Sequence, residues 1–142
     1  MQKLFSKSLI IAILAIISVG CGDDGSIVVI KDDNITHNTP PCLSLEIYPY
    51  STGFEKVVKK SVSIEKNCRY RMQISTAESI HCNSSFNAPL KSTSNFPNAY
   101  LRIELRRGMD ILATYYKDFT SPPDEDDLKK ALQKLRSAGV KI

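Results

Sequence analysis

The chain has 142 residues, a formal net charge of +4, 24% charged residues and no tryptophan. This length is enough for one compact domain and too short for two. A dedicated nucleic-acid-binding protein would concentrate a larger basic excess on one face, so this mild charge argues against that class and against nucleic acid as a partner.

The first residues have the layout of an export signal. Two lysines precede an unbroken apolar run at residues 9–17, and this run ends in small residues before Cys21. The run is too short to cross a bilayer, which needs about 20 apolar residues. A positive start, a short apolar run and a small-residue step are the three parts of a secretory signal peptide. We therefore expect residues 1–20 to be removed on export, which leaves 122 residues with a charge near +2.

Where this layout meets Cys21, it resembles the precursors of bacterial lipoproteins, whose lipobox ends in a cysteine that receives a diacylglycerol and becomes the new N-terminus. Val19, Gly20 and Cys21 match the motif, whereas Ser18 stands where the family usually has leucine. The resemblance covers only residues 1–21 and implies nothing about the fold that follows. It implies acylation of Cys21, with palmitate among the acyl chains, and a membrane partner contacted through this lipid anchor. Cleavage before Cys21 without lipid is the alternative, because ordinary signal peptidase also accepts small residues at these positions.

The resemblance also bears on localisation within the cell envelope. An aspartate directly after the lipidated cysteine is the usual family signal for retention in the inner membrane. Here Gly22 occupies that place and Asp23 the next. The resemblance therefore favours the outer membrane over the inner membrane, and it does not identify the leaflet.

Residues 21–41 form the predicted tether between the anchor and the folded part. They are mostly polar and end in two prolines, with one apolar patch, Ile27–Ile30, that is long enough for a short strand. A flexible chain of this length spans roughly a few tens of ångströms. Asn34 begins a glycosylation sequon that has the acidic extension of bacterial periplasmic acceptors, although an ordinary polar linker explains the same residues.

The cysteines gain meaning in an oxidising compartment. The chain has Cys21, Cys42, Cys68 and Cys82. Lipid on Cys21 leaves three thiols, whereas a free Cys21 allows two bridges. We favour a bond between Cys68 and Cys82, because it would tie a long polar loop to a strand at a modest closure cost. A bond from Cys42 to either partner stays open, since spacing does not fix connectivity.

From Cys42 onward the apolar pattern predicts strands. Leu43, Leu45 and Ile47 alternate with polar residues, which is typical of a strand with one buried face. A second alternating region covers residues 62–74 with a candidate turn at residues 66–68, or it forms one long bent strand. Residues 76–97 are rich in Ser, Thr and Asn and predict a long loop, which in a small domain is usually functional, tied down or disordered.

A hairpin is predicted next. Pairing Leu105 with Ile111 places Arg106 opposite Asp110 and leaves residues 107–109 as the loop. Three arginines, at positions 102, 106 and 107, suggest an anion site, but charges on the outer face of a hairpin are usually solvated.

The last predicted element is a helix. Ser121 can cap its start, Pro122 suits the first helical position and Gly139 ends it. One face carries the apolar stripe Leu128, Ala131, Leu132, Leu135 and Ala138. A stripe of this width favours packing against the sheet over a partner or a membrane.

No catalytic, metal or cofactor site is predicted. The only histidines are His37 and His81, and the position of Cys82 beside His81 in sequence does not establish the geometry of a Cys-His hydrolase, which is the enzymatic alternative. A metal site would need three or four convergent ligands, and no such spacing of His and Cys is present.

We therefore expect an α+β domain over residues 42–142, a small antiparallel sheet of four to five strands packed against one C-terminal helix. The first functional hypothesis is a non-enzymatic envelope lipoprotein, a structural or accessory component of a membrane-associated complex that contacts an unidentified envelope protein through a sheet edge or residues 76–97. The second is an exported module that binds a small ligand or a receptor, with an apolar pocket between sheet and helix.

Overall fold

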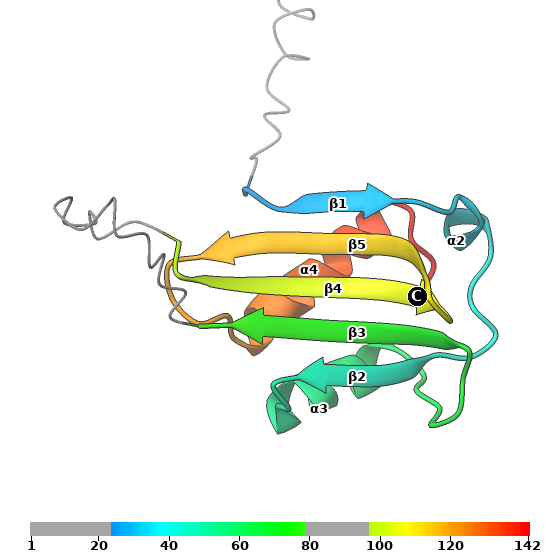
Figure 1. Ribbon diagram of the computed structural model, residues 1–142, viewed down its shortest axis with the longest axis horizontal. Coiled ribbons are helices and arrows are strands. Elements are labelled where there is room, and N and C mark those ends of the chain that lie inside the picture. The colour runs from blue at the N-terminus through cyan, green and yellow to red at the C-terminus, as the bar shows by residue number, and fades with distance from the viewer. Residues whose placement is uncertain (1–23, 79–96) are drawn as a thin grey trace, which may run out of the picture.

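The computed structural model describes residues 24–78 and 97–142. Its strands and helices are, in chain order, β1 (Ile27–Ile30), α2 (Asn34–His37), β2 (Ser44–Tyr48), α3 (Thr52–Ser61), β3 (Tyr70–Ala77), β4 (Ala99–Arg107), β5 (Asp110–Phe119) and α4 (Glu125–Ser137). The strands form one sheet in the order β1-β5-β4-β3-β2, in which β2 and β3 are parallel and the other described pairs are antiparallel (Figure 1). The predicted α+β class, with five strands in one sheet and a C-terminal helix, is confirmed. The expected antiparallel pairing holds except between β2 and β3, which are parallel.

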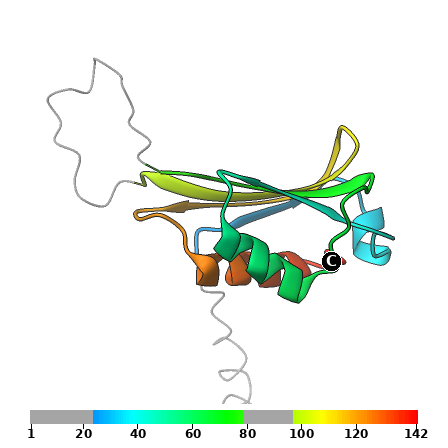
Figure 2. The ribbon, with the colours of Figure 1, turned by 90° about the horizontal axis from the view of Figure 1, so that it is seen from below.

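Two helices cover one face of the sheet. Figure 2 shows α3 and α4 together on that side. Between sheet and helices lies the core, which contains Met72, Ile74, Leu101, Ile103, Leu105 and Tyr115 from the strands and Phe54, Val57, Val58, Leu128, Leu132 and Leu135 from the helices. Burial of each such leucine stabilises the fold by about 2 kcal/mol. The predicted stripe of α4 therefore faces the core, except that Ala138 is exposed.

Helix α3 is not predicted from the sequence, and the strand expected at Val62 and Ile64 is wrong. Phe54, Val57 and Val58 have the helical spacing i, i+3, i+4 and are buried. The helix supplies the crossover that two parallel strands require, here β2 and β3. Val62 is the C-cap of α3, and Ile64 lies in the loop that follows. Both side chains pack against the core, which explains the alternating apolar pattern without a strand.

The predicted hairpin forms with a different register. Leu105 pairs with Ala113, and Arg107, not Arg106, stands opposite Asp110. A bulge between Leu105 and Arg106 inserts one extra residue in β5, so that Leu112 and Ala113 are both buried. The loop is shorter than expected and contains Gly108 with a φ of +62°, a left-handed conformation that glycine adopts without strain.

Helix α4 begins later than predicted. Its N-cap is Asp124, whose carboxylate accepts the backbone N–H groups of Asp126 and Asp127, each at 2.9 Å. The Asp127 carboxylate accepts the Asp124 N–H at 3.1 Å, which completes a capping box. The Ser121 cap is wrong because Pro123 follows Pro122, and a residue before proline disfavours the helical conformation. The predicted end is confirmed, since Gly139 has a φ of +97° after the last turn.

We predict that Asp124→Ala lowers the free energy of unfolding by about 1 kcal/mol, because two backbone N–H groups lose their acceptor. Ser121→Ala is the matched control and should change it by less than about 0.5 kcal/mol. Urea denaturation of both variants measures this difference. A larger effect from Ser121→Ala would contradict the observed cap.

Residues 24–41 belong to the domain, and a flexible tether that reaches residue 41 is wrong. The short strand expected at Ile27–Ile30 forms and pairs with β5. Ile35 in α2 is buried, and its carbonyl accepts the backbone N–H of Lys141 at 2.8 Å. Four consecutive β-branched residues suit a strand, and the open edge of β5 gives them a partner. Any linker between Cys21 and the folded part is therefore only a few residues long.

Candidate interaction surface

The face of the sheet opposite α3 and α4 is here called the outer face. In Figure 2, none of the helices in the two described segments covers it. Directly paired residues point to the same side of a sheet, so the register places one row across all five strands. This row reads Tyr48, Ser75, Arg102, Tyr116 and Ile27 from β2 to β1. The neighbouring row reads Glu46, Gln73, Glu104, Thr114 and Val29.

Glu104 lies at the centre of the outer face between two arginines. Arg106 donates from Nε and Nη2 to one Glu104 oxygen at 2.9 and 2.6 Å. Arg102 Nε lies 3.6 Å from the other oxygen and donates to Ser75 Oγ at 3.3 Å. The Glu104 side chain is only 8% exposed, and a buried charge is costly unless it is paired. The guanidinium groups of Arg102 and Arg106 compensate its negative charge.

The arginines considered for an anion site all have carboxylate partners. Arg102 and Arg106 share Glu104, and Arg107 Nη2 lies 3.5 Å from Asp32. These carboxylates compete with any incoming anion for the same guanidinium groups. The geometry therefore does not support an anion site and instead describes a polar surface with balanced charge.

A second ion pair joins β2 to β3 on the same face. Arg71 Nη1 donates to Glu46 at 2.8 Å, and this hydrogen bond raises the pKa of the Arg71 guanidinium. Arg71 Nη2 also reaches the Gly108 carbonyl at 3.4 Å. Two hydrogen bonds therefore hold the planar Arg71 guanidinium at the surface of the sheet, so the rotamer entropy of this side chain is already reduced.

Tyrosines lie beside these ion pairs. The rings of Tyr100 and Tyr116 stack with their centroids 5.8 Å apart. The Tyr116 hydroxyl donates to Asp118 at 2.6 Å, and this bond raises the Tyr116 pKa to about 12. Tyr48 is more than half exposed at the β2 edge. Tyrosine and arginine are enriched in protein–protein interfaces, and the first outer-face row contains Tyr48, Arg102 and Tyr116. The second row contains neither residue type.

Asp24 fixes the start of the described chain to two other elements. Its carboxylate accepts the Ser26 hydroxyl at 2.5 Å and lies 3.7 Å from Lys117 in β5 and 3.5 Å from Lys134 in α4. The Asp24 pKa is lowered to about 2. The hydrogen bonds from Ser26 are the largest cause of this lowering, and the positive charges of Lys117 and Lys134 add to it. This cluster holds the N-terminal end of β1 against the domain.

We predict a loss of stability in acid that depends on Asp24. Because its folded pKa of about 2 lies below the ordinary value of 3.8, its contribution is present above pH 4 and is lost as the pH falls toward 2. Ser26→Ala should raise the Asp24 pKa more than Lys134→Ala does. NMR titration of the Asp24 carboxyl carbon measures both shifts, and an unchanged pKa in Ser26→Ala would contradict the assigned cause.

The disulfide joins Cys42 to Cys68, with Cα atoms 5.8 Å apart. The favoured Cys68–Cys82 bond is wrong, because the Cys68 sulfur is already bonded, whereas the open pairing of Cys42 is now settled. Cys42 lies just before β2 and Cys68 just before β3, so the bond ties the starts of two parallel neighbours. Cys82 lies outside the described residues.

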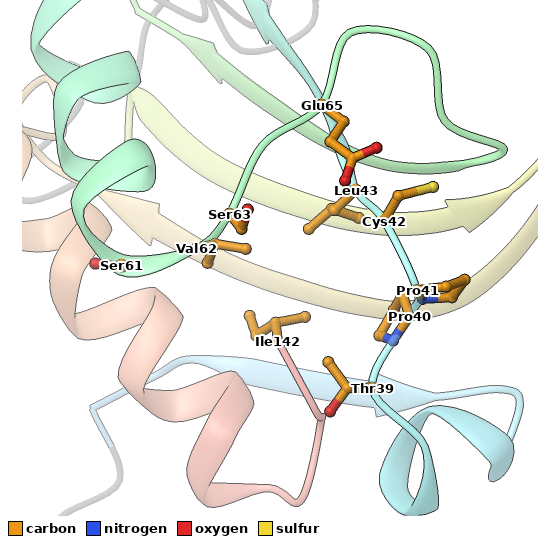
Figure 3. Close-up of a pocket in the computed structure, with 10 residues that line it drawn as sticks. All are labelled: Thr39, Pro40, Pro41, Cys42, Leu43, Ser61, Val62, Ser63, Glu65 and Ile142. Atoms are coloured by element: carbon orange, nitrogen blue, oxygen red, sulfur yellow. The ribbon is translucent and has the colours of Figure 1, made fainter.

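Two pockets flank the segment of residues 39–41. The first has a volume of about 180 Å³ and is lined, as Figure 3 shows, by Thr39, Pro40, Pro41, Cys42, Leu43, Ser61, Val62, Ser63, Glu65 and Ile142. The second, of about 240 Å³, includes Asp32, Asn34, Tyr70 and Arg107. Both are smaller than the roughly 300 Å³ at which small-molecule sites begin. The walls of the first come largely from loops, and those of the second from loops, α2 and strand ends. Neither is lined by α4, unlike the pocket between sheet and C-terminal helix that the ligand-binding hypothesis expects.

Some of the other predicted site residues lie in the described segments and some lie outside them. Asn34 is exposed but is the first residue of α2, not part of a flexible linker, and its glycosylation stays a prediction. His37 is exposed in the same helix. Cys21, His81 and residues 79–96 of the predicted loop lie outside the described residues, whereas Thr76 and Ala77 belong to β3.

Within residues 24–78 and 97–142, no group of three or more His, Cys, Asp or Glu side chains is arranged to hold a metal ion. In the same two segments, no helix combines the length and the apolar character needed to span a membrane.

Comparisons with known proteins add little to this geometry. No family model and no curated protein matches the chain. One solved structure that it resembles is a PelC dodecamer from Paraburkholderia phytofirmans, at 10% identity and a TM-score of 0.35, over 82% of this chain and 99% of that one. The comparisons assign this chain to no family.

Proposed function

We propose that this protein is an exported, non-enzymatic lipoprotein of the cell envelope that forms part of a membrane-associated assembly. The observation that carries the proposal is the Cys42–Cys68 disulfide. Disulfides form and persist in oxidising compartments and are rare in the cytosol. This bond supports the export that residues 1–20 predict, and export is the condition under which Cys21 meets the lipid-transfer machinery.

The cysteine count also fits acylation of Cys21. With Cys42 and Cys68 paired, Cys21 and Cys82 remain. A lipid on Cys21 leaves Cys82 as the single remaining thiol. Two or more acyl chains, at about 0.8 kcal/mol for each buried methylene group, would keep the protein on the membrane.

The surface offered to a partner in this proposal is the outer face. It presents stacked tyrosines and paired arginines on a rigid sheet, and its buried Glu104 is already satisfied by Arg102 and Arg106. Such a surface loses little side-chain entropy on binding, because its long side chains are already held. Binding through satisfied polar groups and aromatic rings suits a protein partner and needs no catalytic group.

Intact mass of the mature protein from the membrane fraction tests export and acylation together. The expected species begins at Cys21, carries acyl chains and contains one disulfide, whereas Cys21→Ser should be released from the membrane. A full-length product with Met1 in the cytosol would refute the proposal.

Site-specific photocross-linking in intact cells tests the partner surface. A photoreactive residue at Tyr116, on the outer face, should yield an adduct of higher mass. The matched control is Gln133, exposed on α4 on the opposite side of the sheet. Recovery of monomer alone from the Tyr116 position, across growth conditions, would count against an assembly on this face.

A further inference from the structure

The position of Asp24 limits how far the domain can stand from a lipid at Cys21. Asp24 is three residues beyond Cys21 and is held by Ser26, Lys117 and Lys134. Three residues span at most about 11 Å, even fully extended. A bilayer that holds Cys21 would therefore lie close to the start of β1.

Strand β1 is the sheet edge nearest to that point. Its four residues, Ile27–Ile30, are all apolar, and Ile27 and Val29 are 57% and 44% exposed on the outer face. Soluble proteins usually protect such an edge by keeping it very short or by placing charged residues, proline or a bulge in it. Strand β1 is short, but its four residues include no charge, no proline and no bulge.

The backbone of β1 also leaves hydrogen-bonding groups on the open edge. The Lys31 N–H donates to the Leu112 carbonyl at 2.8 Å, which extends the β1–β5 ladder by one residue. In an antiparallel ladder, hydrogen-bonded and non-hydrogen-bonded pairs alternate, so the N–H and C=O groups of Val28 and Ile30 point away from β5. The edge is thus apolar in its side chains and polar in its backbone, a combination suited to the headgroup boundary of a bilayer.

We propose that the β1 edge rests on the bilayer that holds the Cys21 acyl chains, with Ile27 and Val29 at the boundary between headgroups and hydrocarbon. This inference depends on the lipid anchor of the proposed function. The short chain between Cys21 and Asp24 favours a lipid surface over another occupant, because it keeps β1 beside the membrane at all times. The sheet then stands on edge, and its outer face points sideways toward neighbours in the same membrane.

The β2 edge gives an internal control. It lies four strand spacings from β1, or about 19 Å. Tyr48 occupies the same row across the sheet as Ile27 and is 54% exposed, almost the same fraction. A reporter at these two positions therefore differs mainly in its distance from the membrane.

The experiment uses tryptophan, which the chain lacks, so each variant has one reporter. Acylated Ile27→Trp and Tyr48→Trp are reconstituted in phosphatidylcholine vesicles with brominated acyl chains. An interfacial residue sits roughly 5–10 Å deep, so Ile27→Trp should lose about half of its fluorescence and shift to the blue. Tyr48→Trp should keep its solution spectrum. Val29→Trp serves as a second reporter if Ile27→Trp does not fold.

The outcomes separate the two proposals. If mass spectrometry shows the acyl chains but the brominated lipid quenches both reporters equally or neither, this inference fails and the proposed function stands. If the Ile27→Trp spectrum shifts only with rising protein concentration and without lipid quenching, a second copy occupies the edge and the inference fails. Absence of acyl chains from Cys21 refutes the lipid anchor itself and this inference with it.

Discussion

Replacement of both Cys42 and Cys68 by serine is expected to lower the free energy of unfolding by about 3.5 kcal/mol. The bond closes a loop between residues separated by 26 positions, and removing it gives the unfolded chain more conformations. Because folded domains are stable by only about 5–15 kcal/mol, this loss should lower the melting temperature by roughly 10 °C or more. Calorimetry or guanidinium denaturation of the oxidised wild type and the double variant measures it.

Single variants distinguish this bond from the pairing favoured by sequence. Cys42→Ser should cost nearly as much as the double replacement, whereas Cys82→Ser should leave the disulfide in place. The reverse order, with Cys82→Ser destabilising and Cys42→Ser neutral, would contradict the observed connectivity.

The correct disulfide could not be predicted because it depends on a helix that the sequence pattern hides. Parallel pairing of Ser44 with Arg71 brings the start of β2 beside the start of β3, and both cysteines lie just before those strands. Only a crossover such as α3 allows this arrangement. If α3 is not recognised, the sequence from Pro49 onward predicts a turn followed by further strands. The sequence then gives no reason to place Cys42 beside Cys68.

Elements with a long, single periodicity were predictable. The leucines of α4 repeat at helical spacing, and β4 and β5 alternate on both sides of Gly108, so a helix and a hairpin follow from local pattern. The details that depend on tertiary contacts were not predictable from the sequence. The bulge near Leu105 is favoured because it buries Leu112 and Ala113 together, and no local rule in the sequence requires that.

The outer face also combines features that the sequence predicts with features that only the fold reveals. Arg102 and Arg106 stand two residues on either side of Glu104 in one strand, so their common face was readable from the sequence. The pairing of Glu46 with Arg71, and of Asp32 with Arg107, joins residues far apart in the chain and required the fold. The sequence therefore locates charged side chains on a surface, while the sheet register decides that they neutralise one another.

Leu132→Ala is expected to lower the free energy of unfolding by about 3 kcal/mol, because it opens a cavity where α4 packs on the sheet. Leu132 is 1% exposed and belongs to the same core as Ile103 and Tyr115. Gln133→Ala, on the exposed side of the same helix, should change stability by less than about 0.5 kcal/mol and serves as the control. Urea denaturation compares the two.

The Leu132 result also decides what the apolar stripe of α4 does. A change of less than about 1 kcal/mol in Leu132→Ala would mean that the site loses little packing, as expected if the stripe faced a partner or a membrane. A large change places the stripe in the core, and the other surfaces then remain for contact. Because α3 and α4 cover one face of the sheet, the surfaces that residues 24–78 and 97–142 leave for a partner are the outer face and the sheet edges, and β1 is the edge that follows the Asp24 cluster in the chain.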